Sequence, residues 1–237
     1  PNRIMTPLPV LEPLLDTALA PFAHRLSLAD DGERIDAPGS PGADRIPATG
    51  LLEDAIMSDL MHRFRPDVCK TAPRAVFSFW TQHYFLRLLP PVLAANLIFE
   101  RDLTLDLDRV TVVIDAEGLP ARFLLRDTGA PIPAGTGGTA RFARLEANHL
   151  TPLITSWSAQ TRLSPRLFWS NIARYLRWVM AQLPELGAEA AAPTLNAWLS
   201  ESILAESARR RPCCLRDHLP GLAICGDCPK LNRRRDV

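Results

Sequence analysis

Four of the five cysteines in this 237-residue chain lie within sixteen positions near its C-terminal end. The vicinal pair Cys213-Cys214 is followed, after ten residues, by Cys225 and then, after two more, by Cys228. Clustered thiolates are soft ligands, which favour zinc, copper(I) or iron–sulfur centres. Structural zinc usually takes two C-x2–4-C pairs, and a vicinal pair does not provide one of them. The spacing therefore predicts a metal centre at these four residues and favours iron–sulfur over zinc.

Zinc binding, disulfide formation and unpaired packing remain as alternatives for these cysteines. Disulfides persist mainly in oxidising compartments. The first residues, Pro1 to Thr6, lack the charged region and apolar run of a signal peptide. We therefore expect a cytoplasmic protein whose thiols are reduced. The fifth cysteine, Cys69, lies far from the others and is expected to be a small packed residue.

The C-C-x10-C-x2-C ending resembles the [2Fe–2S]-binding C-terminus of the FhuF family of bacterial ferric-siderophore reductases. Three upstream stretches are similar to the body of that family: Trp80-Thr-Gln-His-Tyr84, Leu89-Pro-Pro91 and Leu163–Asn171. The resemblance spans roughly residues 50–230, with boundaries uncertain by a few residues. It implies that Cys213, Cys214, Cys225 and Cys228 hold one [2Fe–2S] cluster.

The resemblance also implies an activity, namely one-electron reduction of Fe(III) in a ferric siderophore of the hydroxamate type, with Fe(II) released in the cytosol. The sequence has neither a dinucleotide-binding G-x-G-x-x-G nor a flavin motif. We therefore expect an external electron donor, such as a ferredoxin or a flavin reductase. Two alternatives are a non-enzymatic iron–sulfur electron carrier and a zinc-stabilised siderophore-binding or biosynthesis-related domain.

Four side chains outside the cysteine region are candidates for substrate binding. Trp80 and Trp169 fall in the family-like stretches, so one of them is expected to line a ligand cleft, although tryptophans at helical positions are most often core. His83 and Arg87 share a helix face at i, i+4 and are candidates to contact an acidic siderophore oxygen. The alternative for this second pair is a solvated surface.

Charge is distributed unevenly along the chain. The net charge of +1 argues against nucleic-acid binding, whereas residues 209–237 alone carry a net +5. Arg211 and Arg216 flank the vicinal cysteines and are expected to raise the potential of an anionic cluster. His218, inside the cysteine loop, is expected to hydrogen-bond a sulfur or solvent rather than replace a thiolate.

The most apolar stretch, Tyr84 to Phe99, contains Arg87 and the Pro90-Pro91 pair. It falls short of a membrane span. Peripheral association with the inner membrane stays open.

The periodicity predicts a mostly helical α+β fold with a small antiparallel hairpin or sheet. The cysteine spacing and the family resemblance add a C-terminal iron–sulfur loop to this prediction. Three parts are expected: an N-terminal helix and Pro/Gly-rich linker (1–50), a reductase-like body (51–208) and a cluster-binding segment (209–237). Helices are predicted at 9–25, 51–64, 71–89, 92–99, 145–160, 165–183 and 194–208. Strands are predicted at 103–107, 110–114 and 121–125, and a mobile loop at 128–139.

Overall fold

The computed structural model describes the chain except for residues 1–6, 30–43, 202–211, 226–227 and 233–237. In chain order its N-terminal half contains 3-10 helices (η), α-helices and strands at η1 (Pro9–Asp16), α1 (Ala20–Ala23), β1 (Leu26–Leu28), β2 (Asp44–Pro47), η2 (Ala48–Leu52), α2 (Asp54–Phe64), α3 (Pro73–Leu97), β3 (Arg101–Asp102), η3 (Leu107–Arg109), β4 (Val110–Ile114) and β5 (Pro120–Leu125). The remainder contains β6 (Ala130–Pro131), η4 (Gly138–Phe142), α4 (Ala143–Leu145), the π-helical η5 (Glu146–Leu150), α5 (Thr151–Thr161), α6 (Pro165–Gln182), η6 (Pro184–Leu186), η7 (Glu189–Ala191), α7 (Ala192–Glu201), η8 (Arg216–His218) and α9 (Pro229–Asn232). The predicted α+β class is confirmed.

A hairpin of β4 and β5 forms the centre of the sheet, as the sequence predicted. Its turn is fixed by Asp115, whose carboxylate accepts hydrogen bonds from the backbone N–H groups of Glu117 and Leu119 at 3.0 and 2.8 Å. Gly118 completes the turn at φ +78°, where a Cβ would lie 2.7 Å from the carbonyl oxygen of Leu60. Only glycine fits both the backbone angle and the space.

Two strands that the sequence did not predict complete this sheet. Among the described residues the strand order is β1-β5-β4-β2. β2 pairs antiparallel with β4, but β1 runs parallel to β5, so the sheet is mixed rather than purely antiparallel. Both strands precede residue 50, and hydrogen bonds therefore cross the proposed boundary between N-terminal part and body. The division into three parts stays a prediction.

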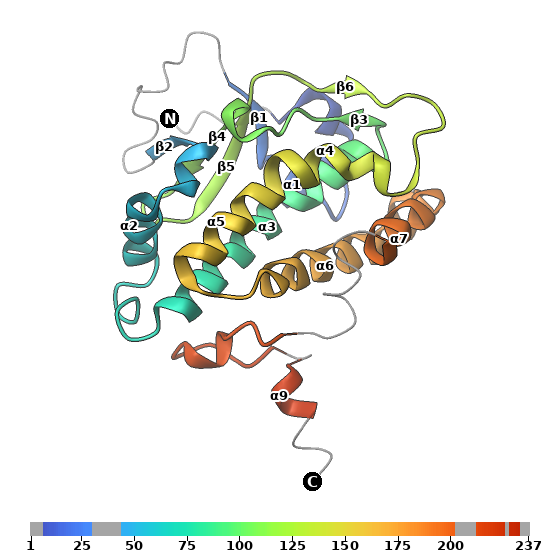
Figure 1. The fold of residues 1–237 in the computed structure, drawn as a ribbon. Helices are drawn as coiled ribbons and strands as arrows, with labels where there is room; N and C mark the ends of the chain where they lie inside the picture. The colour runs from blue at the N-terminus through green and yellow to red at the C-terminus, as the bar shows by residue number, and fades with distance from the viewer. Residues whose placement is uncertain (1–6, 30–43, 202–211, 226–227, 233–237) are drawn as a thin grey trace.

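The long helix α3 runs through the middle of the molecule (Figure 1). The sequence predicted that Pro90-Pro91 would break or kink this helix; a break does not occur, because both prolines lie inside one continuous helix. They remove the N–H donors for the carbonyls of Leu86 and Arg87. α3 is nevertheless buried over most of its length, since the sheet, α1, α2 and α6 pack around it. Packing on several sides outweighs the local cost of the prolines.

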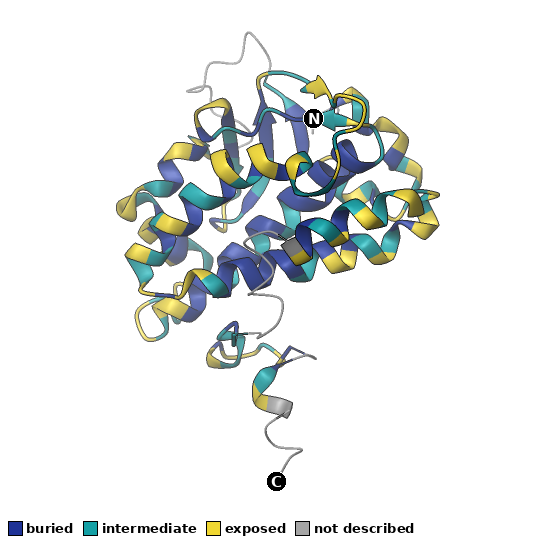
Figure 2. Ribbon diagram, turned by 45° about the vertical axis from the view of Figure 1, so that its right-hand side comes forward, coloured by how far each residue is buried: buried dark blue, intermediate teal, exposed yellow. Residues whose placement is uncertain are grey.

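Around α3 lies a continuous apolar core, drawn dark blue in Figure 2. Aromatic rings fill its centre, with Trp80, Tyr84 and Trp157 within about 6 Å of one another. Each polar atom of these rings has a partner. Trp80 donates to the carbonyl of Gly118 at 2.7 Å, and Trp157 donates to the carbonyl of Leu51 at 2.9 Å. Hydrogen bonds thus satisfy the polar edges of a core that apolar burial stabilises.

A buried hydrogen-bond chain crosses the same core. His149 lies in the π-helical turn, and its Nδ1 is 2.6 Å from the carbonyl oxygen of Leu105, to which it donates. The opposite ring nitrogen, Nε2, then accepts from the hydroxyl of Tyr84 at 2.8 Å. Complete burial lowers the pKa of His149 to about 4. The imidazole is therefore neutral at physiological pH.

The helices after the hairpin follow the sequence prediction more closely. α6 begins where Ser164-Pro165 predicted, and the Ser164 hydroxyl accepts from the backbone N–H of Arg166 at 3.3 Å. The predicted helix 145–160 is present as η5 and α5, preceded by α4. α7 supports the predicted last helix up to Glu201, and its continuation to residue 208 lies outside the described residues.

The N-terminal prediction of one helix over 9–25 was wrong. The segment divides into the 3-10 helix η1 and the short α1. Pro13 lies within η1 and has no N–H to donate, and the Thr17 hydroxyl then donates to the Leu14 carbonyl at 2.8 Å. These local features end the first helix early.

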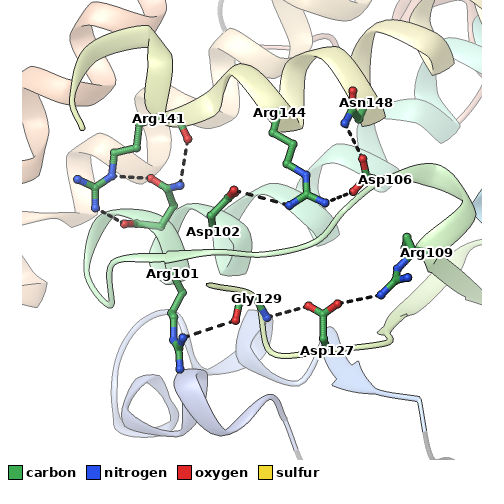
Figure 3. Close-up of polar contacts among 10 residues, drawn as sticks. Arg101, Asp102, Asp106, Arg109, Asp127, Gly129, Arg141, Arg144 and Asn148 are labelled. Atoms are coloured by element: carbon green, nitrogen blue, oxygen red, sulfur yellow. Dashed lines mark hydrogen bonds and ion pairs between the residues drawn. The ribbon is translucent and has the colours of Figure 1, made fainter. Parts of the chain in front are cut away.

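The predicted strand 103–107 was also wrong, although Leu103, Leu105 and Leu107 are all buried. This segment packs through its side chains and is held by the polar contacts drawn in Figure 3. Arg144 forms ion pairs with Asp106 and Asp102, and Arg109 pairs with Asp127 at 3.3 Å. Side-chain contacts therefore replace the backbone pairing that a strand requires.

Candidate functional site

Three of the four clustered thiols are gathered in the structure. Cys214, Cys225 and Cys228 are 9%, 7% and 2% exposed and form a small buried group separate from the main core. The Sγ atoms of Cys214 and Cys225 are 3.7 Å apart. No disulfide joins any of these cysteines among the described residues. We call residues 212–232, of which 226–227 are not described, the cysteine segment.

The local backbone explains how residues so close in sequence come together. Leu215 adopts φ +62°, a left-handed conformation that reverses the chain directly after the vicinal pair. Gly221 adopts φ +76° after the 3-10 turn η8. At the C-x2-C end, the N–H of Cys228 donates to the carbonyl of Cys225 at 3.0 Å. Two reversals and one turn thus place thiols from both ends of the segment side by side.

Cys213 has different surroundings from the other three cysteines. It is half-buried, and its thiol lies 3.6 Å from a carboxylate oxygen of Asp217 and 3.4 Å from the N–H of Leu215. Burial raises the pKa of this thiol above its ordinary value. Asp217 also accepts from the ammonium of Lys230, and that hydrogen bond lowers the pKa of the carboxyl group. Lys230 thus joins the two ends of the cysteine segment.

The donor set fits an iron–sulfur cluster or another thiophilic metal centre. Two thiolates bound tetrahedrally to one ion at about 2.3 Å are about 3.8 Å apart. The 3.7 Å between Cys214 and Cys225 matches this spacing, and Cys228 is buried against the same pair. Within the described residues, no three Cys, His, Asp or Glu side chains surround one point at metal-binding distance.

The cysteine segment lies at the foot of the molecule, beside α3 and on the side away from the sheet (Figure 1). The buried Ser78 hydroxyl of α3 donates to the carbonyl of Cys214 at 2.8 Å. The guanidinium of Arg216 lies over the ring of Phe79, 5.4 Å from its centroid. Arg65 donates to the carbonyl of Pro220 at 3.3 Å. Contacts close to the thiols, from consecutive residues of α3, thus attach the segment to the body.

A cavity of about 350 Å3 opens between α3 and α6, next to this attachment. We call it the α3–α6 cavity. Phe79, Gln82, His83 and Leu86 of α3 line one side, at the i, i+3, i+4, i+7 spacing of a single helix face. The other side and the rim are formed by Arg174, Tyr175, Trp178 and Arg216. Arg216 is two residues from Cys214 in sequence, and Cys214 acts electrostatically on the lining residue Tyr175, so the cavity lies near the cysteine segment.

Burial and positive charge set the electrostatics of the cavity. Burial lowers the pKa of His83 to about 4, and Arg87 and Arg216 add to this effect. Burial raises the pKa of Tyr175 to about 12. Both side chains are therefore neutral hydrogen-bonding groups at physiological pH. Trp178 is 36% exposed and packs edge-on against Phe22 at 5.4 Å, which leaves part of an indole face at the opening.

The structure separates the four substrate-binding candidates. His83 lines the α3–α6 cavity, and Arg87, one turn further along α3, is half-buried and acts on it electrostatically. Trp80 and Trp169 are 0% and 3% exposed, and neither lines the α3–α6 cavity. Both rings instead fill the core, because they lie on helix faces that pack inward.

The candidates for tuning the cluster also differ in position. Arg216 lies between the thiols and the cavity. His218 is exposed, and its Nε2 is 3.5 Å from Lys230 and 3.9 Å from Asp217 rather than at a sulfur. Arg211 lies outside the described residues.

Sequence reasoning missed Phe79, Arg174, Tyr175 and Trp178 as cavity residues. The pair Arg174 and Trp178, at i, i+4, was a signal that could have marked the cavity side of α6. Cys69, expected to be packed, is half-exposed with its Sγ 3.3 Å from Nδ1 of His62. That pair lines a separate cavity of about 540 Å3 beside α2.

None of the described helices is long and apolar enough to cross a bilayer.

Comparison with known proteins gives a consistent result. A family model described as ferric iron reductase FhuF-like transporter matches residues 78–220. The match includes most of α3, all of α6 and the pair Cys213-Cys214, and it ends before Cys225. The ferric siderophore reductase of Escherichia coli (strain K12) is 24% identical over 190 residues, covering 73% of this chain and 72% of the relative.

Proposed function

The chain belongs to the FhuF-like ferric iron reductase family, and on this premise we propose that it reduces Fe(III) in a hydroxamate-type ferric siderophore to Fe(II). One structural observation carries the proposal to particular residues. Phe79 and Arg216 line the α3–α6 cavity, and Ser78, next to Phe79 in α3, donates a hydrogen bond to the backbone carbonyl of Cys214. A ligand in the cavity would therefore lie next to the thiols.

We propose Cys213, Cys214, Cys225 and Cys228 as the ligands of one [2Fe–2S] cluster. When bound, such a cluster would supply single electrons, which is the chemistry that reduction of Fe(III) to Fe(II) requires. The spacing of Cys214 and Cys225 and the burial of Cys228 support this assignment. Cys213 reaches the same site only if its thiol leaves Asp217, which Lys230 already neutralises.

Residues of α3 and α6 that line the α3–α6 cavity would bind the ferric chelate. Phe79, Tyr175 and Trp178 provide apolar surface for the carbon backbone of a siderophore. Gln82 and the neutral His83 provide hydrogen-bonding groups for its amide and hydroxamate oxygens. Hydroxamate oxygens are hard ligands that hold Fe(III) more tightly than Fe(II), so reduction weakens the complex. Iron release then follows from the change in oxidation state.

We propose that the electrons come from a separate protein such as a ferredoxin or a flavin reductase, and that the reaction takes place in the cytosol. The basic residues around the cysteine segment, Arg216 and Lys230 among them, support an acidic donor, since positive charge steers acidic partners.

Anaerobic single-turnover measurements test the proposal. The purified protein should be reddish-brown and contain iron and acid-labile sulfide. After chemical reduction and removal of the reductant, the protein should reduce the Fe(III) of ferrioxamine B to Fe(II). A chelator that forms a coloured complex with Fe(II) measures the product. A colourless zinc protein would overturn the cluster assignment. A reduced cluster that no ferric siderophore reoxidises would instead indicate an electron carrier.

A further inference from the structure

The charged side chains of the α3–α6 cavity have one sign only. Arg174 and Arg216 contribute positive charge from two different elements, and among the described lining residues none is acidic. Arg87 adds a third positive group nearby, since it lowers the pKa of His83. Asp115 acts in the opposite direction and raises the pKa of His83, but its effect is weaker than that of Arg87 or Arg216. The cavity therefore has a positive potential.

Neither lining arginine is neutralised within the described part of the chain. Arg174 and Arg216 have no acidic ion-pair partner there. The nearest carboxylate in sequence to Arg216, Asp217, is instead paired with Lys230 at 2.5 Å. The charge of Arg174 is therefore available to a ligand, whereas the charge of Arg216 acts on both the cavity and the anionic cluster proposed beside it.

Part of this charge is also poorly hydrated. The Nε atom of Arg216 and an Nη atom of Arg87 are buried without a hydrogen-bond partner among the described residues. A buried donor without an acceptor is unfavourable, at about 1–3 kcal/mol. Arg216 is held over Phe79, so its guanidinium cannot turn freely into solvent. An anionic group in the cavity would stabilise this positive charge through space.

We propose that the α3–α6 cavity selects ferric chelates of net negative charge, such as hydroxamate siderophores whose backbone carries free carboxylates, over neutral and cationic chelates. This inference rests on the proposed function. The iron centre of a tris-hydroxamate complex is itself neutral, so the selected charge lies on the backbone. Arg174 and Arg216 are the residues that recognise the charge of the siderophore backbone.

A matched set of three ligands tests the charge preference. Ferrioxamine B carries a free ammonium group, its N-acetyl derivative is neutral, and its N-succinyl derivative carries a carboxylate. All three present the same iron coordination. We would measure Kd from quenching of tryptophan fluorescence, with Trp178→Phe to identify the signal from the cavity. Each step from +1 to 0 to −1 should tighten binding about fivefold at low salt, and 0.5 M salt should shrink the difference.

Variants locate the effect in the cavity. Arg174→Gln and Arg216→Gln should each reduce the ratio between the Kd values of the acetyl and succinyl ligands. Arg177→Gln, an exposed arginine of the same helix, should leave that ratio unchanged. Equal Kd values for the three ligands, or a preference that survives in both cavity variants, would overturn the inference while the proposed reduction stands. If none of the ligands binds or is reduced, the proposed function fails, and this inference fails with it.

Discussion

The hydroxyl of Ser78, buried in α3, donates a 2.8 Å hydrogen bond to the backbone carbonyl of Cys214. This bond connects the helix at the centre of the core to the middle of the clustered thiols. The next residue, Phe79, supports Arg216 and lines the α3–α6 cavity. Two consecutive side chains of one helix therefore contact the proposed cluster ligands and the proposed substrate cavity.

Replacing Ser78 by Ala should loosen the cysteine segment. The change leaves a buried carbonyl without its donor, at a cost of about 1–3 kcal/mol. Hydrogen exchange in residues 212–225 should become faster, and iron should be lost sooner to a chelator. Ser156→Ala is a control for loss of a serine hydroxyl elsewhere in the fold, since its acceptor, the Leu52 carbonyl, keeps the hydrogen bond from Gln160. Equal exchange in both variants would show that the Ser78 bond does not hold the segment.

Replacement of any clustered cysteine by serine should remove iron and sulfide. A serine hydroxyl is a harder and weaker ligand for iron than a thiolate. We expect Cys213→Ser, Cys214→Ser, Cys225→Ser and Cys228→Ser to lose most of both elements, measured per protein chain. Cys69→Ser should keep them, because Cys69 contacts His62 and not the other thiols. Full loading in one of the four variants would remove that cysteine from the ligand set.

Removing the charge of Arg216 should lower the reduction potential of the protein. A positive group near an anionic cluster favours the reduced form. For a partly exposed charge the effect is on the order of 1 kcal/mol, or about 40 mV for one electron. A spectroscopic redox titration of Arg216→Gln measures it, with the exposed Arg126→Gln as control. Identical potentials for both variants and the parent would refute the electrostatic role.

Stability should fall as pH falls from 6.5 towards 4, partly because of His149. In this range the unfolded chain binds a proton at this histidine, whereas the folded protein, with a pKa of about 4, does not. Stability therefore rises with pH here, and the contribution of His149 is constant above pH 6.5. The loss by pH 4 is up to about 3 kcal/mol.

Urea unfolding at several pH values checks this prediction. His149→Gln should show a shallower dependence between pH 4 and 6.5, and the exposed His24→Gln should retain the slope of the parent. Some dependence should persist in His149→Gln, since the pKa of His83 is lowered in the same range. Parallel curves for His149→Gln and the parent would mean that His149 is not the titrating group.

Two glycines at positive φ should differ in their tolerance of alanine. At Gly118 a Cβ would clash with the Leu60 carbonyl, and we expect Gly118→Ala to cost about 2–4 kcal/mol. At Gly187, φ is +63° and nothing lies within 4 Å of an added Cβ, so backbone strain alone should cost about 1 kcal/mol. Thermal unfolding compares the two, and equal losses would contradict a close contact at Gly118.

Local signals predicted the elements that local chemistry determines. The hairpin follows from β-branched residues around Asp115–Gly118, and the start of α6 follows from Ser164-Pro165. The continuity of α3 through Pro90 was not predictable, because it depends on packing by distant segments. β1 and β2 were missed for a related reason, since each has only three or four residues and is stabilised by the hairpin that it joins.

The candidate site also contains one part that the sequence predicted and one part that it did not. The thiols were found because they are close in sequence and their spacing is distinctive. The cavity combines residues near positions 80, 175 and 216, and no single segment shows its pattern. Trp80 and Trp169 were chosen because they lie in family-like stretches, but those stretches also supply the core, where both rings are buried.

Because α3 contacts both the cysteine segment and the cavity, it also limits where residues can be inserted during evolution. Phe79, His83 and Leu86 face the cavity, while Ser78 faces the cysteine segment, and each added residue turns an α-helix by about 100°. One insertion between Ser78 and Leu86 would turn the cavity side chains away from the thiols and would also move the core side chains of this stretch, such as Tyr84, out of position. Descendants of this sequence can lengthen in the loop between β6 and η4, but this stretch of α3 must keep its register.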